Sequence, residues 1–570
     1  MALFFNGRLW ETPATMSVVN DDAMYNRNLS VGNVVAFVGR STGGQPNTAL
    51  AFGSPDEARA VLKSGDLLDA IVKAFDPSAE TGAAATIIGV RVNPATQSTL
   101  TLKSAGAADV ITLTSTDYGL SANGIKVKVE AATNKGLKLT TQNGNDYYAA
   151  DDVYRDAFSV VYGGAQATAT ITINGTTVTL AAPAGSTVAT IDLASYPTIQ
   201  QLVDRINVVS GFTAAVLDGN GEQEALNGLD YVTAQSVKTS YTATANLQAA
   251  VDWFNGIGEG FVNAARVAGV GAAPASINWT YLSGGSDGTV TNTEWQNAYT
   301  TLQAEDVQYV VPLSSSSAIH AMNDSHCAYM SNIARMERRG FVGGASSATD
   351  DAAIAAAKAL NSDRTAYVHL GYYDYNDAGK LVLFEPYMLA AMIAGAFAGV
   401  NPGTPLTNKS LKVRGLERKL RNPTDTDKLI RGGVLCVEEK PNGYRVVKSI
   451  STWLTNKNYN RVEVSTGVAC DFVARNVRNA LDPLRGSKAG PQLLGMAIAR
   501  AESALRELAR SEPQGPGVIV GDAKSPAYRN ISASIEGDVL RVQFECSPVI
   551  PANYIPVTIF AVPYSGSATA

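Results

Sequence analysis

Three histidines and one short glycine–serine run are the residues of this chain most suited to catalysis. A serine nucleophile needs a histidine within hydrogen-bonding reach as its general base, and the candidates are His320, His326 and His369. The nearest approach to a nucleophile motif is Gly343-Gly-Ala-Ser-Ser347, a poor match to a Gly-Thr-Ser element. His320 and His326 fall in or near an expected helix, and His369 falls on an apolar strand. We therefore predict that the histidines are structural and assign no catalytic residue.

The sequence also contains no clear motif for binding a metal ion or a cofactor. His320 and His326 are six residues apart, which puts them on different faces of a helix. The run Gly256-Ile-Gly258-Glu-Gly260 has the wrong spacing for a dinucleotide fingerprint, and no suitable strand precedes it. The cysteines are Cys327, Cys436, Cys470 and Cys546. Their scatter, without a CxxC pair, predicts buried and reduced thiols, and we expect neither a metal nor a cofactor.

Length and composition are typical of a multidomain globular protein made in the cytosol. At 570 residues the chain is expected to hold several domains. Its charged content of 17% is low, as in a protein that hides surface against copies of itself, although a Gly- and Ala-rich sequence gives the same value. The formal charge of −6 argues against nucleic-acid binding. The N-terminus does not resemble a signal peptide, and the longest apolar stretch, 387–400, is too short for membrane insertion.

Alternation of buried strands and amphipathic helices predicts an α/β core. Residues 33–39 and 85–92 are expected to be buried strands, which favours a parallel sheet. Between them, Ser54-Pro55 with Glu57 has the pattern of a helix start, and a second helix is expected from Asp66. The pattern resumes after residue 288 with expected strands at 307–313, 341–343 and 365–370 and helices at 318–339 and 352–360.

A β-rich insertion is expected to interrupt this core. From about Thr96 to Tyr281 the chain is rich in Thr, Ala, Asn and Gly, and Asn174-Gly175 is a strong hairpin signal. This segment holds 9 basic and 15 acidic residues. We therefore expect a mostly β, solvent-facing domain.

A third unit is expected from about Val434. Helices are predicted at 467–484 and 491–511 and an alternating strand at 539–545. The predicted layout is an N-terminal arm at 1–30, core α/β segments at 31–95 and 282–433, the inserted β-rich domain at 96–281, an α+β C-terminal domain at 434–552, and a C-terminal strand or arm at 553–570.

The most distinctive pattern is an apolar strand predicted at 553–564. Pro556 lacks an N–H, which favours an edge position, and an apolar edge strand needs a receiver. Two receivers are possible: residues 539–545 of the same chain, or a neighbouring molecule by strand addition. The N-terminal arm has the same two alternatives. The residues predicted to exchange between subunits are Phe4, Phe5, Leu9, Trp10, Ile555, Val557, Ile559, Phe560 and Val562.

A basic segment at 408–422 is a second candidate contact. Its cations are Lys409, Lys412, Arg414, Arg418, Lys419 and Arg421, against Glu417. They form a solvated face or an inter-subunit electrostatic contact, with nucleic-acid binding as the third alternative. Residues 431–570 hold 16 basic and 12 acidic residues, opposite in sign to the insertion, and such asymmetry can direct subunit pairing.

The order of these pieces resembles the contractile tail sheath proteins of bacteriophages. The matching segments, spread over some 500 residues, are Val34-Val-Ala-Phe-Val-Gly-Arg-Ser-Thr-Gly-Gly44, Asp117-Tyr-Gly-Leu-Ser-Ala-Asn-Gly124, Gly284-Gly-Ser-Asp-Gly288, Asp306-Val-Gln-Tyr-Val-Val-Pro312, Arg461-Val-Glu-Val-Ser, the helix at 493–508, and Pro548-Val-Ile-Pro-Ala-Asn-Tyr-Ile555. The resemblance implies a subtilisin-like core without a catalytic triad, the β insertion, an α+β C-terminal sheath domain and terminal extended arms.

The resemblance also implies a mechanism and partners. Subunits would stack as hexameric rings around a tail tube, linked by exchanged terminal strands, and would contract to drive the tube through the host envelope. Implied partners are the chain itself, the tube protein, and the baseplate and terminator proteins. The implied location is the virion tail, after assembly in the host cytoplasm. Alternatives are the sheath of a headless injection particle or bacteriocin, a subtilisin-like hydrolase, and a β-rich adhesin or tail fibre.

Overall fold

The computed structural model describes residues 3–5, 8–10, 34–258 and 260–566. The chain divides into two compact units. The first is centred on Pro94–Thr289, and the second on Pro46–Asn93 and Val290–Ala570 together with the strand β3 (Val34–Gly39). Both contain helices and strands, so the fold is mixed α/β, as predicted.

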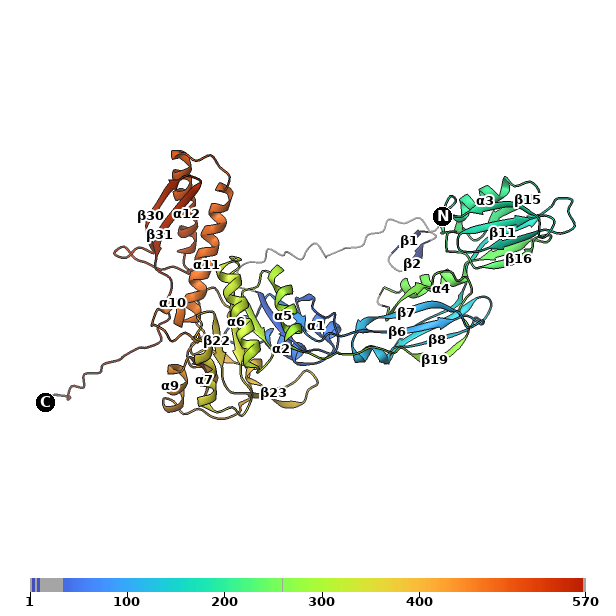
Figure 1. The fold of residues 1–570 in the computed structure, drawn as a ribbon. Coiled ribbons are helices and arrows are strands. Elements are labelled where there is room, and N and C mark those ends of the chain that lie inside the picture. The colour runs from blue at the N-terminus through green and yellow to red at the C-terminus, as the bar shows by residue number, and fades with distance from the viewer. Residues whose placement is uncertain (1–2, 6–7, 11–33, 259, 567–570) are drawn as a thin grey trace. The chain divides into compact units, whose positions relative to one another are not determined.

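A seven-stranded sheet forms the centre of the second unit (Figure 1). Its order is β27-β22-β21-β20-β3-β5-β4, and every neighbouring pair is parallel except β4 with β5. Its remaining strands are β4 (Ala49–Phe52), β5 (Thr86–Arg91), β20 (Tyr309–Pro312), β21 (Arg339–Gly343), β22 (Thr365–Val368) and β27 (Val434–Leu435). β3 and β5 are buried at every position, as the sequence predicted, because helices cover both faces of the sheet.

Seven helices of the second unit cover or flank this sheet. They are α1 (Pro55–Leu62), α2 (Asp66–Ala74), α5 (Asn292–Thr301), α6 (Ser317–Asn332), α7 (Asp350–Leu360), α8 (Pro386–Ala398) and α9 (Thr424–Arg431). α1 begins where the sequence predicted, with the Ser54 hydroxyl accepting a bond from the N–H of Glu57 at 3.4 Å. α8 is apolar and buried all round, which explains the Ala- and Gly-rich stretch as a core helix. None of the helices in the described ranges is long and apolar enough to cross a bilayer.

The helix predicted at 318–339 was too long. α6 ends at Asn332, and Arg335 adopts a left-handed φ of 61°. The N–H groups of Ala334 and Met336 then bond back to the last turn, so the chain reverses. This reversal lets Arg338 and Arg339 enter the protein interior at the start of β21.

The rest of the second unit consists of two small sheets and a C-terminal α+β element. One sheet has the order β24-β23-β26, and the other β25-β29-β28. Their strands are β23 (Tyr372–Tyr375), β24 (Leu381–Phe384), β25 (Ser410–Leu411), β26 (Gly415–Leu416), β28 (Val437–Lys440) and β29 (Gly443–Val446). The C-terminal element contains α10 (Tyr459–Val462), α11 (Val464–Leu481), α12 (Pro491–Leu508), β30 (Tyr528–Glu536) and β31 (Val539–Cys546).

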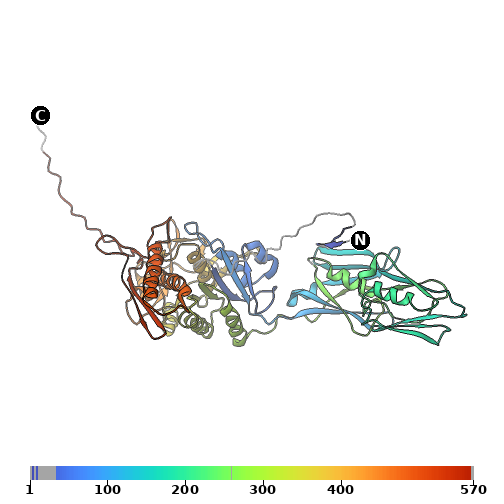
Figure 2. The same ribbon diagram turned by 90° about the horizontal axis from the view of Figure 1, so that it is seen from above.

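The first unit is built mainly of antiparallel sheets (Figures 1 and 2). Their orders are β18-β7-β6, β10-β9-β8-β19, β15-β11-β17 and β14-β13-β12-β16. The strands are β6 (Gln97–Lys103), β7 (Asp109–Tyr118), β8 (Lys126–Ala131), β9 (Leu137–Asn143), β10 (Asp146–Val153), β11 (Asp156–Tyr162), β12 (Thr170–Ile173), β13 (Thr177–Ala181), β14 (Thr187–Asp192), β15 (Phe212–Val216), β16 (Val232–Ser236), β17 (Tyr241–Thr244), β18 (Val262–Arg266) and β19 (Ile277–Tyr281), with helices α3 (Ile199–Asn207) and α4 (Asn246–Asn255). Asn174-Gly175 joins β12 to β13, which confirms the predicted hairpin.

Candidate assembly interface

Each histidine has a partner that fixes its ring in place. The Nε2 atom of His320 lies 2.8 Å from the carbonyl oxygen of Ser314, and that of His326 lies 2.9 Å from an Nη of Arg338. The Nε2 atom of His369 lies 3.0 Å from a carboxylate oxygen of Asp350. Within the described part of the chain, no histidine is hydrogen-bonded to a serine hydroxyl. These contacts agree with structural roles.

The two serines of the glycine–serine run bind carboxylates instead. The Ser346 hydroxyl donates to Glu385 at 3.1 Å, and the Ser347 N–H donates to Glu417. Glu417 also accepts from the N–H of Gly371 at 2.9 Å, so it ties two loops together. Neither serine therefore has a histidine as its hydrogen-bond partner.

His326 makes the stability of the second unit depend on pH. Burial, with a smaller contribution from the Arg338 cation, lowers the pKa of His326 to about 3. The pKa of a histidine in an unfolded chain is about 6.5. Between this value and about 3, the unfolded chain therefore binds one proton more at His326 than the folded chain does. The stability from this site is present above about pH 6.5 and falls by about 1.4 kcal/mol per unit as pH drops towards 3.

Replacing His326 by Gln should flatten this acid slope, because the amide oxygen can still accept from Arg338 but does not titrate. The measurement is unfolding by denaturant between pH 4 and 7 for both proteins. Burial also lowers the pKa values of His320 and His369, which contribute the same background to each protein. An identical slope in the H326Q variant would contradict the assignment.

The cysteines are unpaired and shielded. Cys327 and Cys436 are buried, and Cys470 and Cys546 are half-buried. Burial raises the pKa of the Cys327 and Cys436 thiols to about 12, so both are protonated at neutral pH. Among the described residues, no cluster of three or more His, Cys, Asp or Glu side chains could hold a metal ion.

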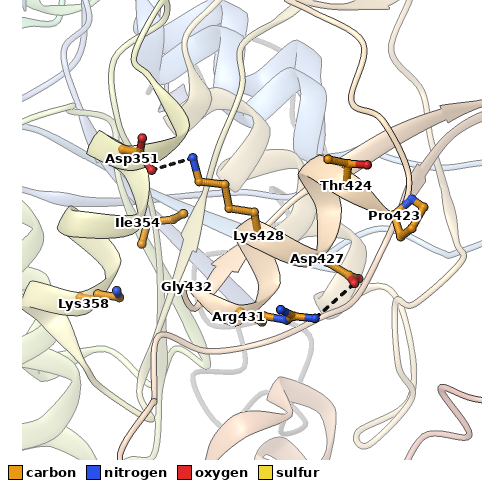
Figure 3. A pocket seen from close by; sticks show the side chains of 9 residues that line it. All are labelled: Asp351, Ile354, Lys358, Pro423, Thr424, Asp427, Lys428, Arg431 and Gly432. Atoms are coloured by element: carbon orange, nitrogen blue, oxygen red, sulfur yellow. Dashed lines mark ion pairs between the residues drawn. The ribbon is translucent and has the colours of Figure 1, made fainter.

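A shallow groove of about 520 Å³ lies between α7 and α9 (Figure 3). Figure 3 shows Lys428 directed at Asp351, at 2.7 Å, and Arg431 directed at Asp427, at 3.6 Å. The charges on the groove wall are thus largely paired with each other. They provide a polar surface and no acid–base pair aimed at a nucleophile.

The predicted basic segment is also engaged within the chain. Lys412 pairs with Asp76, Arg414 with Asp374 at 3.5 Å, Arg418 with Asp350, Lys419 with Glu439 at 3.7 Å, and Arg421 with Asp425 at 2.7 Å. Lys409 has no such partner among the residues that the structure describes. These pairs are mostly exposed, so each contributes little stability. An inter-subunit role for the segment remains a prediction.

The C-terminal element ends in a sheet of only two strands. β30 pairs with β31, and Figure 1 draws both beside α12. The inward side chains pack on α11 and α12, whereas the outer face is polar and carries the Arg529–Glu545 ion pair at 2.7 Å. In the described ranges each strand has one edge without a strand neighbour. A two-stranded sheet is marginal alone, so these edges are candidate acceptors for added strands.

The chain that follows β31 is anchored as far as Tyr554. The N–H of Val520 donates to the carbonyl of Ser547 at 2.9 Å, and the Thr466 hydroxyl donates to that of Val549 at 3.1 Å. The side-chain amide of Asn553 donates to Glu463 at 2.8 Å. We call residues 547–554 the root.

A buried carboxylate holds the end of the root. Burial raises the pKa of Glu463, and the nearby Lys448, 3.1 Å away, opposes that shift. The Lys448 ammonium also lies 5.6 Å from the centre of the Tyr554 ring. The root therefore ends beside the first turn of α11.

The predicted exchange residues of the C-terminus are exposed. Ile555, Val557, Ile559, Phe560 and Val562 are each 76–86% exposed. In the single chain the segment forms no strand and does not pair with residues 539–545, so the predicted exchange with a neighbour stays a prediction.

The direction of the root explains this outcome. Leu540 packs near Leu481 at the end of α11, whereas Cys546 lies near Cys470, so β31 runs towards the start of α11. The root continues in that direction to Glu463. Residues 555–562 would have to reverse and leave the root to reach β31 of their own chain.

The N-terminal prediction lies partly outside the described residues. β1 (Leu3–Phe5) and β2 (Arg8–Trp10) form an antiparallel hairpin that pairs Phe4 with Leu9. This local pairing was not among the predictions from the sequence.

A network of buried charges fixes α11 to the core sheet. Asp471 accepts from Arg339 at 3.1 Å and from Arg364 at 2.8 Å. Arg475 bonds Asp306 at 2.7 Å and lies 3.5 Å from Glu337. A Cβ at Gly467 would lie 2.1 Å from the Arg339 guanidinium, so a larger residue there would displace this side chain. The C-terminal element is thereby held to the start of β21.

Sequence reasoning missed β30, the root and this charge network. β30 has the inward residues Ile531, Ala533 and Ile535 between serines, a weak alternation that could have been noticed. No sequence pattern indicated the charge network, because its residues are far apart in the sequence and only the fold brings them together.

Comparisons with known proteins agree with this architecture. The family model described as "Phage tail sheath protein central domain" matches residues 288–452. The tail sheath protein of Bacillus phage SP01 is 29% identical over 588 residues, covering 99% of this chain and 98% of the relative. The tail sheath protein of Staphylococcus phage Twort is 24% identical, covering 79% and 81%.

Two solved structures share the fold. A sheath tail protein from Listeria innocua aligns with a TM-score of 0.56 at 15% identity, covering 92% of this chain and 94% of its own. A sheath tail protein from Desulfitobacterium hafniense aligns at 0.52 and 12% identity, covering 95% and 100%. The family model over 288–452 and the curated relatives aligned over nearly their whole length thus make this chain similar to phage tail sheath proteins and support the resemblance seen in its sequence.

Proposed function

We propose that this chain is the structural subunit of a contractile tail sheath. Copies would stack as hexameric rings around a tail tube and contract to drive the tube through the host envelope. The observation that carries the proposal is the combination of a two-stranded sheet, with one unpaired edge on each strand among the described residues, and an exposed apolar segment that does not pair with it in the single chain. Strand addition between copies satisfies both at once.

The exchange is heterologous, because a C-terminal segment meets a different surface, the β30–β31 sheet of a neighbour. Contacts of this kind propagate as rings or helices, as a sheath requires. The predicted donor residues are those of the C-terminal segment together with Phe4, Phe5, Leu9 and Trp10. The core sheet, parallel and covered on both faces, supports assigning this region as the family's subtilisin-like sheath domain.

The remaining assignments follow from the family. The partners are the chain itself, the tube, and the baseplate and terminator proteins, and the location is the virion tail after assembly in the host cytoplasm. A headless contractile injection particle would use the same subunit contacts. The hydrolase and adhesin alternatives lose support, because the curated relatives are tail sheath proteins.

Purified protein should form tubes or polymers in negative-stain microscopy and sediment as large species. Strand exchange predicts assembly that grows with concentration, because each contact is between copies. A chain that remains monomeric at high concentration, while folded by circular dichroism, would contradict the proposal.

A further inference from the structure

The hairpin β23–β24 has the reverse of the usual polarity. Its outward residues form two cross-strand pairs, Tyr373 with Leu383 and Tyr375 with Leu381. These four side chains are 36–52% exposed. An antiparallel sheet with one solvated face normally turns polar residues outward, so a solvated face made only of tyrosine and leucine needs another explanation.

The inward face carries the charge instead. Asp374 is buried and pairs with Lys73 at 2.5 Å and with Arg414 at 3.5 Å. Beside it, Tyr372 stacks on Phe384 with ring centres 5.2 Å apart. A charge placed inward fixes the orientation of the hairpin, because turning it over would bury the tyrosines and leave Lys73 without Asp374.

The tip of the hairpin is also fixed, by hydrogen bonds to α1 and α2. The Asp377 carboxylate accepts from the Nε of Arg59 on α1 at 2.7 Å, and its N–H donates to Asp69 on α2 at 2.9 Å. On the other side of β23, Gly415 of β26 faces Tyr373 with no side chain to cover the ring. The apolar face is therefore presented in a fixed geometry, which lowers the entropic cost of binding.

We propose that the outward face of β23–β24 docks against a second copy of this chain; the inference rests on the proposed self-assembly. The area that four side chains on a short hairpin can bury is far below the roughly 800 Å² per partner of a stable pairwise interface. Such a face cannot hold an independent soluble partner alone. It suffices where many copies are already linked by other contacts, because linked contacts reinforce one another.

The surface of the second copy differs from the hairpin itself. If the face paired with its own counterpart, the contact would close as a twofold dimer and stop. A heterologous contact repeats with every added copy. Tyrosine is also a frequent anchor of protein interfaces, and Arg414 stacked over Tyr375 at 4.8 Å supplies a cation at the rim.

The test compares assembly of three proteins: the wild type, the double variant Tyr373→Ser with Leu383→Ser, and the control Val61→Ser. Val61 is an apolar residue of the adjacent helix α1 that is 37% exposed. We expect the double variant to raise the critical concentration for assembly about tenfold or more, and the control to leave it unchanged. Circular dichroism and the thermal midpoint check that each variant folds.

Hydroxyl-radical footprinting provides an independent readout. Tyr373 and Tyr375 should be modified several-fold more slowly in the polymer than in a chain truncated after Tyr554. Polymers in which both tyrosines react as in the truncated chain would overturn the inference, as would normal assembly of the double variant. A wild type that never polymerises would instead overturn the proposed function and this inference with it.

Discussion

A chain truncated after Tyr554 is expected to fold as a monomer and to form no tubes. The truncation removes the exposed apolar segment but keeps Asn553 and Tyr554, so the root and its bond to Glu463 survive. Because the segment contacts little within its own chain, circular dichroism and the thermal midpoint should match the full chain. Sedimentation velocity and negative-stain images measure the loss of assembly.

Two controls sharpen this prediction. Removing only residues 565–570, which follow the apolar segment, should leave tube formation intact. Within the segment, Pro556 already lacks an N–H, so the ladder bonds are expected from Ile555, Val557 and Ile559. Val557→Pro should therefore abolish assembly, whereas Thr558→Pro, on the opposite side of the strand, should retain it.

Normal tubes from the chain truncated after Tyr554 would exclude the C-terminal segment as the link between copies. Equal loss of assembly in both proline variants would contradict the proposed register but leave strand donation in place.

Asp471→Asn is expected to loosen α11 from the core by about 3–5 kcal/mol, the usual cost of breaking a buried ion pair. The substitution keeps the size of the side chain but leaves Arg339 and Arg364 without their carboxylate. Because the chain has two compact units, an unfolding midpoint does not isolate the local stability of α11. Hydrogen exchange of the α11 amides should instead accelerate about a hundredfold or more.

The matched control is Asp482→Asn, which breaks an exposed pair with Arg485 at the end of the same helix. Its effect on exchange should be small, because surface pairs contribute little. Equal acceleration in both variants would show that the buried network does not hold the helix. Under the proposed strand exchange, force from a neighbouring copy would reach the core only if α11 moves with it, which gives the network a function.

Local patterns predicted local structure well. Ser54-Pro55 predicted the start of α1, Asn174-Gly175 predicted the β12–β13 hairpin, and residues 33–39 and 85–92 predicted two parallel strands. Each signal depends on sterics or hydrogen bonds among neighbours in sequence, which the fold did not override.

Predictions that depended on distant partners were less accurate. The helix predicted at 491–511 ends at Leu508, and β30, whose side chains pack near Leu493 and Ala497 of α12, was not predicted. The helix predicted at 318–339 was too long because Arg338 donates to the carbonyl oxygens of Leu302 and Glu305, and these contacts could not be predicted from the sequence. No periodicity reports such tertiary contacts.

The sequence indicated the apolar character of the candidate C-terminal interface, but not how the chain before it is anchored. The apolar alternation at 555–562 indicated a segment in need of a partner. The sequence could not indicate that Asn553 bonds Glu463 and holds the root, and the exchange with a neighbour stays a prediction.

The most direct test of strand exchange is photo-crosslinking in mixed-isotope polymers. A photoreactive phenylalanine replaces Phe560, and equal amounts of ¹⁴N- and ¹⁵N-labelled chains are assembled together before irradiation. The account predicts crosslinks from residue 560 to peptides of 528–546, with about half joining chains of different isotope, as random mixing requires. Crosslinks that join only chains of the same isotope, or that fall outside 528–546, would contradict it.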